Sequence, residues 1–397
     1  MRTNNTNTFD FLDVSGIVSE RNFSTMAKPV GARCNLNCTY CYYLKRGREG
    51  SGIMNEEILE EYIRQYISSQ QSDQVTFCWH GGEPTTAGIE YFEKAFAFQK
   101  KYSLGKEIIN TFQTNGTLID RNWCRLFNEN NILAGLSIDG PPHIHDSHRK
   151  WHRSSSEAAL KAATLFRETG VEFNTLTTVN NLSIGKGKEI YTFLRDVVGS
   201  RFMQFLPVAE SIGTECMATP WSTTPEGYGE FLTEIFDIWV RNDVGKVFVQ
   251  TFEATLAQWC GYPPGVCTLG EYCSDSLTVE YNGDVYPCDH YADEEHRLGN
   301  IMQQPLNEIF ASQQRINFTL GKKTSLPVEC LECRYHFACH GECPKHRFIK
   351  NTDGTMDNHL CSGLKKFFKH VEPYMDHMKM LIESGMPASM IMNIDQQ

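Results

Sequence analysis

The stretch Cys34-Asn35-Leu36-Asn37-Cys38-Thr39-Tyr40-Cys41 places three cysteines close together near the start of the chain. Three thiolates from one loop can hold three corners of a cubane [4Fe–4S] cluster, which leaves the fourth iron without a protein ligand. Such clusters normally take four thiolates, so a three-cysteine site indicates that the open iron binds a substrate or cofactor. Zinc modules are the alternative, but they pair two ligands with two more about a dozen residues on. The next cysteine here is Cys78, so the spacing favours an iron–sulfur cluster.

Segments with strand-like and helix-like patterns alternate along the chain, beginning directly before this loop. We expect strands at Ala27–Gly31, Gln74–Gly81, Glu107–Thr114, Leu133–Asp139, Val171–Asn180 and Arg201–Val208. Amphipathic helices are expected at Asn55–Gln70, Glu90–Tyr102, Asp120–Asn131, Ser155–Thr169 and Gly187–Val198. This alternation predicts an α/β fold, a partial (β/α)6 barrel of parallel strands. Because chemistry in such folds gathers at the carboxyl ends of the strands, the three-cysteine loop should lie at that rim.

The composition excludes several classes of protein. The chain has 37 Lys and Arg against 48 Asp and Glu, a net charge of −11, and no basic block. Nucleic acid is therefore excluded as the main partner. No apolar run is long enough to span a membrane and no apolar signal core precedes Ser24, so a cytoplasmic location is expected. The 15 cysteines of a cytoplasmic chain indicate metal binding or redox chemistry rather than disulfides.

A second group of cysteines follows two further helices, which are expected at Thr224–Asn242 and Phe252–Trp259. The group consists of Cys267, Cys273, Cys288, Cys330, Cys333, Cys339, Cys343 and Cys361. Eight thiolates are enough for two four-cysteine sites. The spacing alone leaves zinc and iron–sulfur equally open as the metal of these sites.

The second expected strand ends in His80-Gly81-Gly82-Glu83-Pro84. Together with the three-cysteine loop, this segment resembles the radical S-adenosylmethionine (SAM) superfamily. The eight-cysteine block resembles the SPASM auxiliary iron–sulfur domain. Over residues 28–374 the order of motifs is similar to that of anaerobic sulfatase-maturating enzymes. The further motifs are Gln113-Thr114-Asn115-Gly116-Thr117, Ser137-Ile138-Asp139-Gly140, Cys288-Asp289 and Leu298-Gly299-Asn300-Ile301.

The resemblance implies SAM and three [4Fe–4S] clusters as cofactors. The cluster of Cys34, Cys38 and Cys41 would chelate SAM through its open iron, with the methionine amino group on Gly81, Gly82 and Glu83. Four other residues are candidate SAM contacts, with ordinary turn or packing roles as the alternative: Tyr40, Asn115, Ser137 and Arg149. The first auxiliary cluster would take Cys267, Cys273, Cys288 and Cys343. The second would take Cys330, Cys333, Cys339 and Cys361.

The resemblance also implies a reaction. A 5′-deoxyadenosyl radical would take a hydrogen atom from Cβ of a Cys or Ser in an unfolded sulfatase segment of the type Cys/Ser-x-Pro-x-Arg, giving Cα-formylglycine. Asp289 would act as general base, with burial and the nearby cluster raising its pKa towards working pH. Electrons would come from a flavodoxin- or ferredoxin-type reductant, and the second electron would leave through the auxiliary clusters. Tyr43 and Gln204 are candidate substrate contacts, and a monomer is expected.

Four segments are expected along the chain. Residues 1–26 form an N-terminal extension, either disordered or the product of a misassigned start, and residues 27–262 form the barrel with its following helices. Residues 263–363 form the auxiliary-cluster domain, and 364–397 a helical tail. Two other functions stay open. One is another SPASM enzyme that forms thioether or carbon–carbon crosslinks in a precursor peptide, and the other is a zinc-dependent binding protein without radical chemistry.

Overall fold

One large sheet organises the molecule. In the computed structural model, which describes residues 22–46, 51–213, 216–352 and 354–396, it has the order β12-β11-β10-β1-β3-β4-β5-β7-β8-β9. The strands of its centre pair in parallel: β1 (Ser24–Lys28), β3 (Gln74–Trp79), β4 (Glu107–Thr114), β5 (Ile132–Ser137), β7 (Phe173–Val179) and β8 (Phe202–Pro207). The predicted α/β partial barrel is therefore confirmed.

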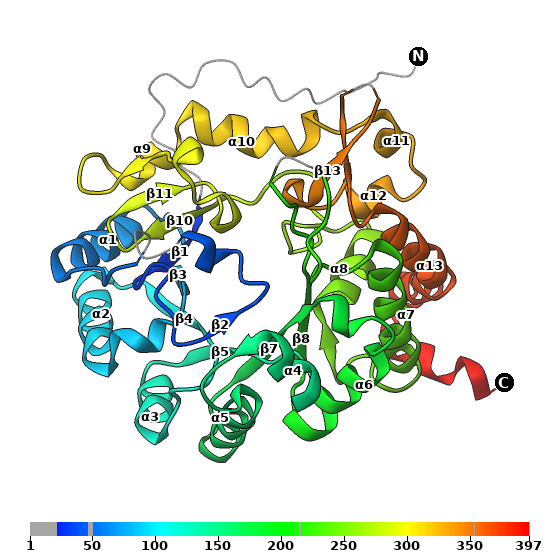
Figure 1. The fold of residues 1–397 in the computed structure, drawn as a ribbon, viewed down its shortest axis with the longest axis horizontal. Helices are drawn as coiled ribbons and strands as arrows, with labels where there is room; N and C mark the ends of the chain where they lie inside the picture. Colours follow the sequence, from blue (N-terminus) through cyan, green and yellow to red (C-terminus); the bar gives the residue numbers. More distant parts are fainter. Residues whose placement is uncertain (1–21, 47–50, 214–215, 353, 397) are drawn as a thin grey trace.

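Helices connect these strands and cover the outside of the arc that they form (Figure 1). They are α1 (Glu56–Ser68), α2 (Ile89–Tyr102), α3 (Arg121–Glu129), α5 (Ser155–Thr169) and α6 (Gly187–Thr192), whereas the short α4 (Pro142–His148) follows β5 and packs on α5. Local capping explains two of the starts. The Asn55 side chain accepts a hydrogen bond from the backbone N–H of Ile58, and Asp120 accepts from those of Asn122 and Trp123.

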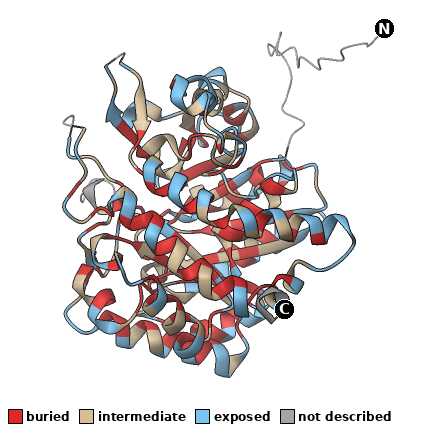
Figure 2. Ribbon diagram, turned by 90° about the vertical axis from the view of Figure 1, so that its right-hand side faces the viewer, coloured by how far each residue is buried: buried red, intermediate tan, exposed pale blue. Residues whose placement is uncertain are grey.

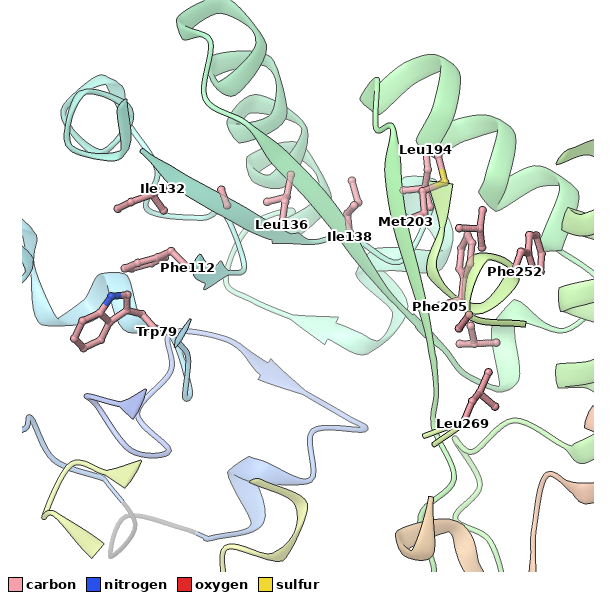
Figure 3. Close-up of a cluster of buried hydrophobic side chains, with 14 of the residues drawn as sticks. Trp79, Phe112, Ile132, Leu136, Ile138, Leu194, Met203, Phe205, Phe252 and Leu269 are labelled. Atoms are coloured by element: carbon pink, nitrogen blue, oxygen red, sulfur yellow. The ribbon is translucent and has the colours of Figure 1, made fainter. Parts of the chain in front are cut away.

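The core lies between the sheet and these helices, where Figure 2 shows most of the buried residues. Alternate strand residues point towards the helices, and Figure 3 shows Trp79, Phe112 and Leu136 among them. The intervening residues face the inside of the arc. Two of them, Gln113 and Ser137, are polar and hydrogen-bonded to each other, with 2.9 Å between Gln113 Nε2 and Ser137 Oγ. Polar side chains that could contact a ligand therefore lie on the inner face of the barrel at the ends of β4 and β5.

The sheet continues beyond the six predicted strands. Strand β9 (Phe248–Val249) pairs with β8, and β10 (Ser276–Glu280) pairs in parallel with β1, so that Lys28 lies opposite Glu280. Strands β11 (Asp284–Tyr286) and β12 (Gly299–Asn300) extend this edge. The segment between Cys273 and Cys288 thus forms part of the barrel sheet. Asp289, which follows this segment directly, comes to lie beside Lys28 of β1.

Three long helices and several short elements complete the fold. Helix α13 (Cys361–Glu383) packs on α7 (Pro225–Asn242) and α8 (Gln250–Trp259) through aromatic contacts such as Phe236 with Phe367. The short strands are β2 (Asn37–Cys38), β6 (Arg149–Lys150), β13 (Arg347–Lys350) and β14 (Met356–Asn358). The remaining helices are α9 (Leu306–Phe310), α10 (Gln313–Thr324), α11 (Val328–Leu331) and α12 (His336–Cys339). Within the described ranges, no helix is long and apolar enough to cross a membrane.

Two expected elements differ from the structure. The first strand is displaced towards the N-terminus: β1 starts at Ser24, so residues 24–26 belong to the sheet and not to an extension. It ends at Lys28 because Pro29 has no N–H to donate and a turn follows, with Gly31 at φ 54°. Residues 1–21 of the expected extension lie outside the described residues. The helix expected at Gly187–Val198 changes after Thr192 into a π-helical turn at Phe193–Val198. Arg167 donates to the carbonyls of Val197 and Val198 at the end of this turn.

Candidate active site

The three-cysteine loop lies inside the arc of strands, where Figure 1 marks β2. Its position is fixed by backbone contacts with the glycine pair after β3. The N–H of Gly82 donates to the Gly31 carbonyl over 2.8 Å, and the N–H of Glu83 donates to the Arg33 carbonyl over 2.8 Å. A Cβ on Gly82 would lie 2.1 Å from the Arg33 oxygen. Glycine is therefore required at 82 because the loop backbone passes directly over it.

The three thiols of the loop are brought together in a desolvated position. Burial raises the pKa of Cys34 to about 12, and the neighbouring Cys38 and Cys41 contribute to the rise. Burial also raises the pKa of Cys38 to about 11, partly offset by Arg149. A bound cation would convert such thiols to thiolates. Three converging cysteines on one loop fit the donor set of a [4Fe–4S] cluster with one open iron.

Glu83 connects the ends of two strands. Its side chain is 1% exposed, and its carboxylate accepts hydrogen bonds from the Thr114 hydroxyl over 2.9 Å and the Asn115 N–H over 2.7 Å. Thr85 donates to the same carboxylate through its N–H and hydroxyl. Burial raises the pKa of Glu83, and these hydrogen bonds partly offset the rise. The predicted SAM contact thus also holds β3 to β4, a role that the motif did not reveal.

Asn115 and Ser137 lie at the ends of β4 and β5. The Asn115 amide donates to Asn35 Oδ1 over 2.9 Å and lies 3.8 Å from the sulfur of Cys34. Ser137 faces the inside of the arc with Gln113, and the strand register places Leu176 next to Ser137 and Gln204 next to Leu176. The structure therefore brings Asn115 to the cysteine loop. It places Ser137 and Gln204 on the same inner face.

Arg149 is paired with a buried carboxylate that the sequence did not single out. Its Nε and Nη2 atoms donate to the two oxygens of Asp139 over 3.0 and 3.1 Å, and Asp139 is 0% exposed. The Tyr40 hydroxyl donates to the same carboxylate. Burial raises the pKa of Asp139, but Arg149, His145 and the Tyr40 hydrogen bond together outweigh it, and the pKa is lowered. Because β2 pairs with β6, this group of charges lies against Cys38.

Asp289 lies in a second group of charges. Its Oδ2 atom accepts a hydrogen bond from the Tyr42 hydroxyl over 2.6 Å and lies 3.5 Å from the ammonium of Lys28. Lys28 is 0% exposed, and its Nζ atom also lies 3.1 Å from Nδ1 of His80. The ring of His290 stacks on Tyr42 at 4.6 Å between centroids. Sequence reasoning missed Lys28 and Tyr42, although Lys28 could have been noticed as a cation within an expected buried strand.

The expected rise in the pKa of Asp289 is wrong for the described residues. Burial raises this pKa, but the charges of Lys28, His290 and His80 and the Tyr42 hydrogen bond outweigh it, so the pKa is lowered. The expectation considered burial and the adjacent cluster without the buried ammonium. The neighbouring ammonium therefore favours the carboxylate form of Asp289, which can accept a proton but is a weaker base than a carboxylate with an ordinary pKa.

Tyr43 is buried beneath this group. Its hydroxyl donates to Oε1 of Glu280 over 2.5 Å, and the Lys28 ammonium lies 4.8 Å from the centre of its ring. Glu280 is the residue opposite Lys28 in the pairing of β1 with β10. Tyr43 thus packs at the junction between the barrel and the strand that leads to Asp289.

The eight later cysteines fall into two groups. The first group consists of Cys267, Cys273, Cys288 and Cys343. Burial raises the pKa of the last three, and in each case other thiols of the same group add to the rise. The second group consists of Cys330, Cys333, Cys339 and Cys361. Burial and neighbouring thiols of this group raise the pKa of Cys330, Cys339 and Cys361, and all four cysteines line a cavity of about 140 Å³. These are the sets that the resemblance implied. Of the four other cysteines, Cys124 is 0% exposed.

Neither group surrounds a single ion. Among the described residues, no three His, Cys, Asp or Glu side chains are arranged to hold one metal ion. The second group instead encloses a cavity with all four sulfurs in its lining. Four thiols around one space fit the donor set of a [4Fe–4S] cluster.

A three-cysteine loop inside a partial barrel, followed by two four-cysteine groups, defines a radical SAM enzyme with an auxiliary iron–sulfur domain. Sequence models of known families agree. The Radical SAM superfamily matches residues 29–194, and SPASM, an iron-sulfur cluster-binding domain, matches residues 267–334. SAM and [4Fe–4S] clusters are therefore its cofactors.

The chain belongs to the anaerobic sulfatase-maturating enzymes. It is 42% identical to the serine-type enzyme of Bacteroides thetaiotaomicron over 92% of this chain and 94% of that one. Identity to the cysteine-type enzyme of Clostridium perfringens is 33%, over 88% of this chain and 96% of that one. The protein is a radical SAM sulfatase-maturating enzyme.

Solved structures agree with this assignment. The structure of native anSMEcpe with bound AdoMet and Cp18Cys peptide matches with a TM-score of 0.82 and 32% identity, covering 90% of this chain and 99% of that one. Streptococcus suis SuiB bound to S-adenosylmethionine matches with a TM-score of 0.60 and 15% identity, over 86% and 77% of the two chains. The second likeness concerns the fold alone.

Proposed function

We propose that this enzyme oxidises a Ser or Cys side chain of a sulfatase polypeptide to Cα-formylglycine, with Asp289 as general base. The observation that carries the proposal is the position of the Asp289 carboxylate, which the Tyr42 hydroxyl and the Lys28 ammonium of β1 hold at the edge of the barrel. Oxidation of the side chain removes a hydrogen atom from Cβ, a proton from the heteroatom and one electron. A base is therefore needed for the proton. A Ser target gives the aldehyde directly, whereas a Cys target gives a thioaldehyde that water hydrolyses to the aldehyde with release of hydrogen sulfide.

When bound, the reduced cluster and SAM supply the radical that removes the hydrogen atom from the substrate Cβ. Cys34, Cys38 and Cys41 would hold that cluster. Gly81, Gly82 and Glu83 would meet the methionine end of SAM. The remaining SAM contacts would come from Tyr40, Asn115, Ser137 and Arg149. The support for these roles is that the residues lie against the loop or on the inner face.

The proton is assigned to one oxygen of Asp289. Oδ2 already accepts a hydrogen bond from the Tyr42 hydroxyl and forms an ion pair with the Lys28 ammonium. Oδ1 faces the sulfur of Cys288 at 3.7 Å, and a cysteine bound to iron as a thiolate has no proton to donate. Oδ1 is therefore the acceptor for the substrate proton. Tyr43 and Gln204 stay as candidate substrate contacts.

The remaining electron would pass to the auxiliary clusters. We propose two of them, on the two cysteine groups described above, which gives three clusters and about twelve irons for the chain. A flavodoxin- or ferredoxin-type reductant and a monomeric state remain predictions. So do a barrel that ends at 262, an auxiliary domain at 263–363 and a helical tail from 364, whereas the start of the barrel moves from 27 to Ser24.

A seryl target is favoured over a cysteinyl one. The relatives named serine-type are 42% and 36% identical to this chain, whereas those named cysteine-type are 33% and 32% identical. Peptide substrates are supported by the solved relative, which binds the Cp18Cys peptide. The sulfatase segment would be of the type Ser-x-Pro-x-Arg.

The test is anaerobic incubation of the reconstituted enzyme with SAM, dithionite and one of two matched peptides, which carry Ser or Cys in the same x-Pro-x-Arg context. Mass spectrometry should show an aldehyde that reacts with a hydrazine, formed faster on the Ser peptide. Deoxyadenosine without a hydrazine-reactive product would favour the crosslinking alternative. Faster reaction of the Cys peptide would contradict the seryl assignment only.

A further inference from the structure

Arg347 lies between the two auxiliary cysteine groups. It is 9% exposed, and its guanidinium donates hydrogen bonds in two directions. Nη1 donates to the Lys322 carbonyl over 2.7 Å and to the Ser325 hydroxyl over 3.2 Å. Nε and Nη2 donate to three successive carbonyls: Gly341 at 3.0 Å, His340 at 3.3 Å and Glu342 at 3.2 Å.

These three residues join a cysteine of one group to a cysteine of the other. We call residues 340–342 the cluster bridge, because Cys339 of the second group precedes them and Cys343 of the first group follows. All three have left-handed backbone, with φ of 48°, 72° and 51°. That conformation is unfavourable for a residue with a Cβ. A turn of this hand directs the three carbonyls to the one guanidinium.

Gly341 shows how tightly the guanidinium fits. A Cβ at this position would lie 2.9 Å from Nη2 of Arg347 and 2.2 Å from Cδ2 of Leu326. The guanidinium therefore occupies the space inside the bridge. All of the N–H donors of the guanidinium are used in hydrogen bonds, and the ammonium of a lysine could not make this planar set of contacts.

The charge of Arg347 is not cancelled by its hydrogen-bond partners, which are all neutral oxygens. Glu342 is the carboxylate of the bridge, and it is bound instead by His346 over 2.8 Å and by the Asn358 amide over 2.7 Å. The guanidinium therefore presents its positive charge to the backbone that joins Cys339 of the second group to Cys343 of the first.

We propose that Arg347 is a shared positive charge that raises the reduction potentials of both auxiliary clusters while it holds the bridge between them. The proposal rests on the cluster assignment of the proposed function. A cluster becomes more negative when it takes an electron, so a buried cation nearby favours the reduced state. Both clusters are thereby made better acceptors for the electron that leaves the substrate.

Lys322 offers a matched comparison. It is 1% exposed, and its ammonium donates to the carbonyls of Cys267 and Thr268 over 2.6 and 2.9 Å. Cys267 belongs to the first group only. Loss of the Lys322 charge should therefore change the potential of the first cluster and leave the second unchanged.

The experiment is an EPR-monitored redox titration of the full-length reconstituted enzyme, without substrate, for the wild type, Arg347→Gln and Lys322→Met. For Arg347→Gln we expect the equilibrium constant for reduction of both auxiliary clusters to fall about tenfold, a downward shift of about 59 mV for a one-electron couple. For Lys322→Met only one cluster should shift. An unchanged pair of potentials in Arg347→Gln would overturn the proposal.

A second variant keeps the test decisive if Arg347→Gln loses iron. Ser325 is exposed and accepts from Nη1, so Ser325→Glu would place a carboxylate against the intact guanidinium, with Ser325→Gln as its neutral control. If both cluster potentials are lower in Ser325→Glu than in Ser325→Gln, the shared charge is supported. If the two variants have equal potentials, the proposal is overturned. Wild-type enzyme with iron for only one cluster would instead contradict the cluster assignment.

Discussion

The ammonium of Lys28 lies 3.5 Å from Oδ2 of Asp289, although Lys28 ends the first strand of the sheet and Asp289 follows β11, far along the chain. The contact exists because β10 pairs with β1 and brings the segment after β11 back to the inner face of the barrel. The buried ammonium keeps Asp289 ionised. The auxiliary part of the chain thus supplies a carboxylate to a site built by the barrel, and the proposed function makes this carboxylate the base.

Replacing Lys28 tests this pairing. We expect Lys28→Met to slow peptide oxidation about tenfold or more, because Asp289 loses the charge that keeps it ionised. Removal of one partner of a buried pair should also cost about 3 kcal/mol of stability. Oxidation is measured by hydrazine capture, and stability by denaturant unfolding. Lys28→Arg, which retains the charge, should recover part of the rate, and wild-type oxidation by Lys28→Met would exclude the role of Lys28.

Gly82 should be required for the first cluster. In Gly82→Ala the new Cβ would lie 2.1 Å from the Arg33 oxygen, so we expect the three-cysteine loop to be displaced and its cluster to be lost. Iron analysis should fall from about twelve to about eight per chain. Gly321→Ala is the control, because its Cβ would meet nothing within 4 Å. A full iron content in Gly82→Ala would show that the loop tolerates the displacement.

The Asp139–Arg149 pair should matter for stability. Asp139→Asn leaves Arg149, which is 8% exposed, without its carboxylate, and we expect a loss of about 3–5 kcal/mol. Denaturant unfolding measures it. Arg121→Gln, which removes an exposed pair with Glu168, should change stability by less than about 1 kcal/mol. Equal losses of stability in the two variants would mean that the buried pair contributes no more to stability than the exposed pair.

The auxiliary ligand sets can be separated by single substitutions. Cys330→Ala should remove the second auxiliary cluster, so that iron falls by about four per chain and the EPR signal of that cluster disappears. Cys124→Ala, a buried cysteine outside both groups, should retain all of the iron. Loss of iron in Cys124→Ala or its retention in Cys330→Ala would require a different ligand set.

Local patterns predicted much of this structure. The limits of β4 and α5 are those expected, because alternation and capping are properties of neighbouring residues. The cysteine groups were predicted through the spacing and the family resemblance. The residues that contact Asp289 and Arg149 could not be predicted in this way, because those contacts depend on which strands pair. The register of Lys28 with Glu280 and the hydrogen bonds of Asp139 join segments that no local pattern relates.

The most direct measurement is formylglycine and deoxyadenosine formation by Asp289→Asn in the same anaerobic reaction. We predict wild-type iron content and continued cleavage of SAM, with aldehyde formation at least about a hundredfold slower, because no base takes the substrate proton. Aldehyde formation at the wild-type rate would contradict the account.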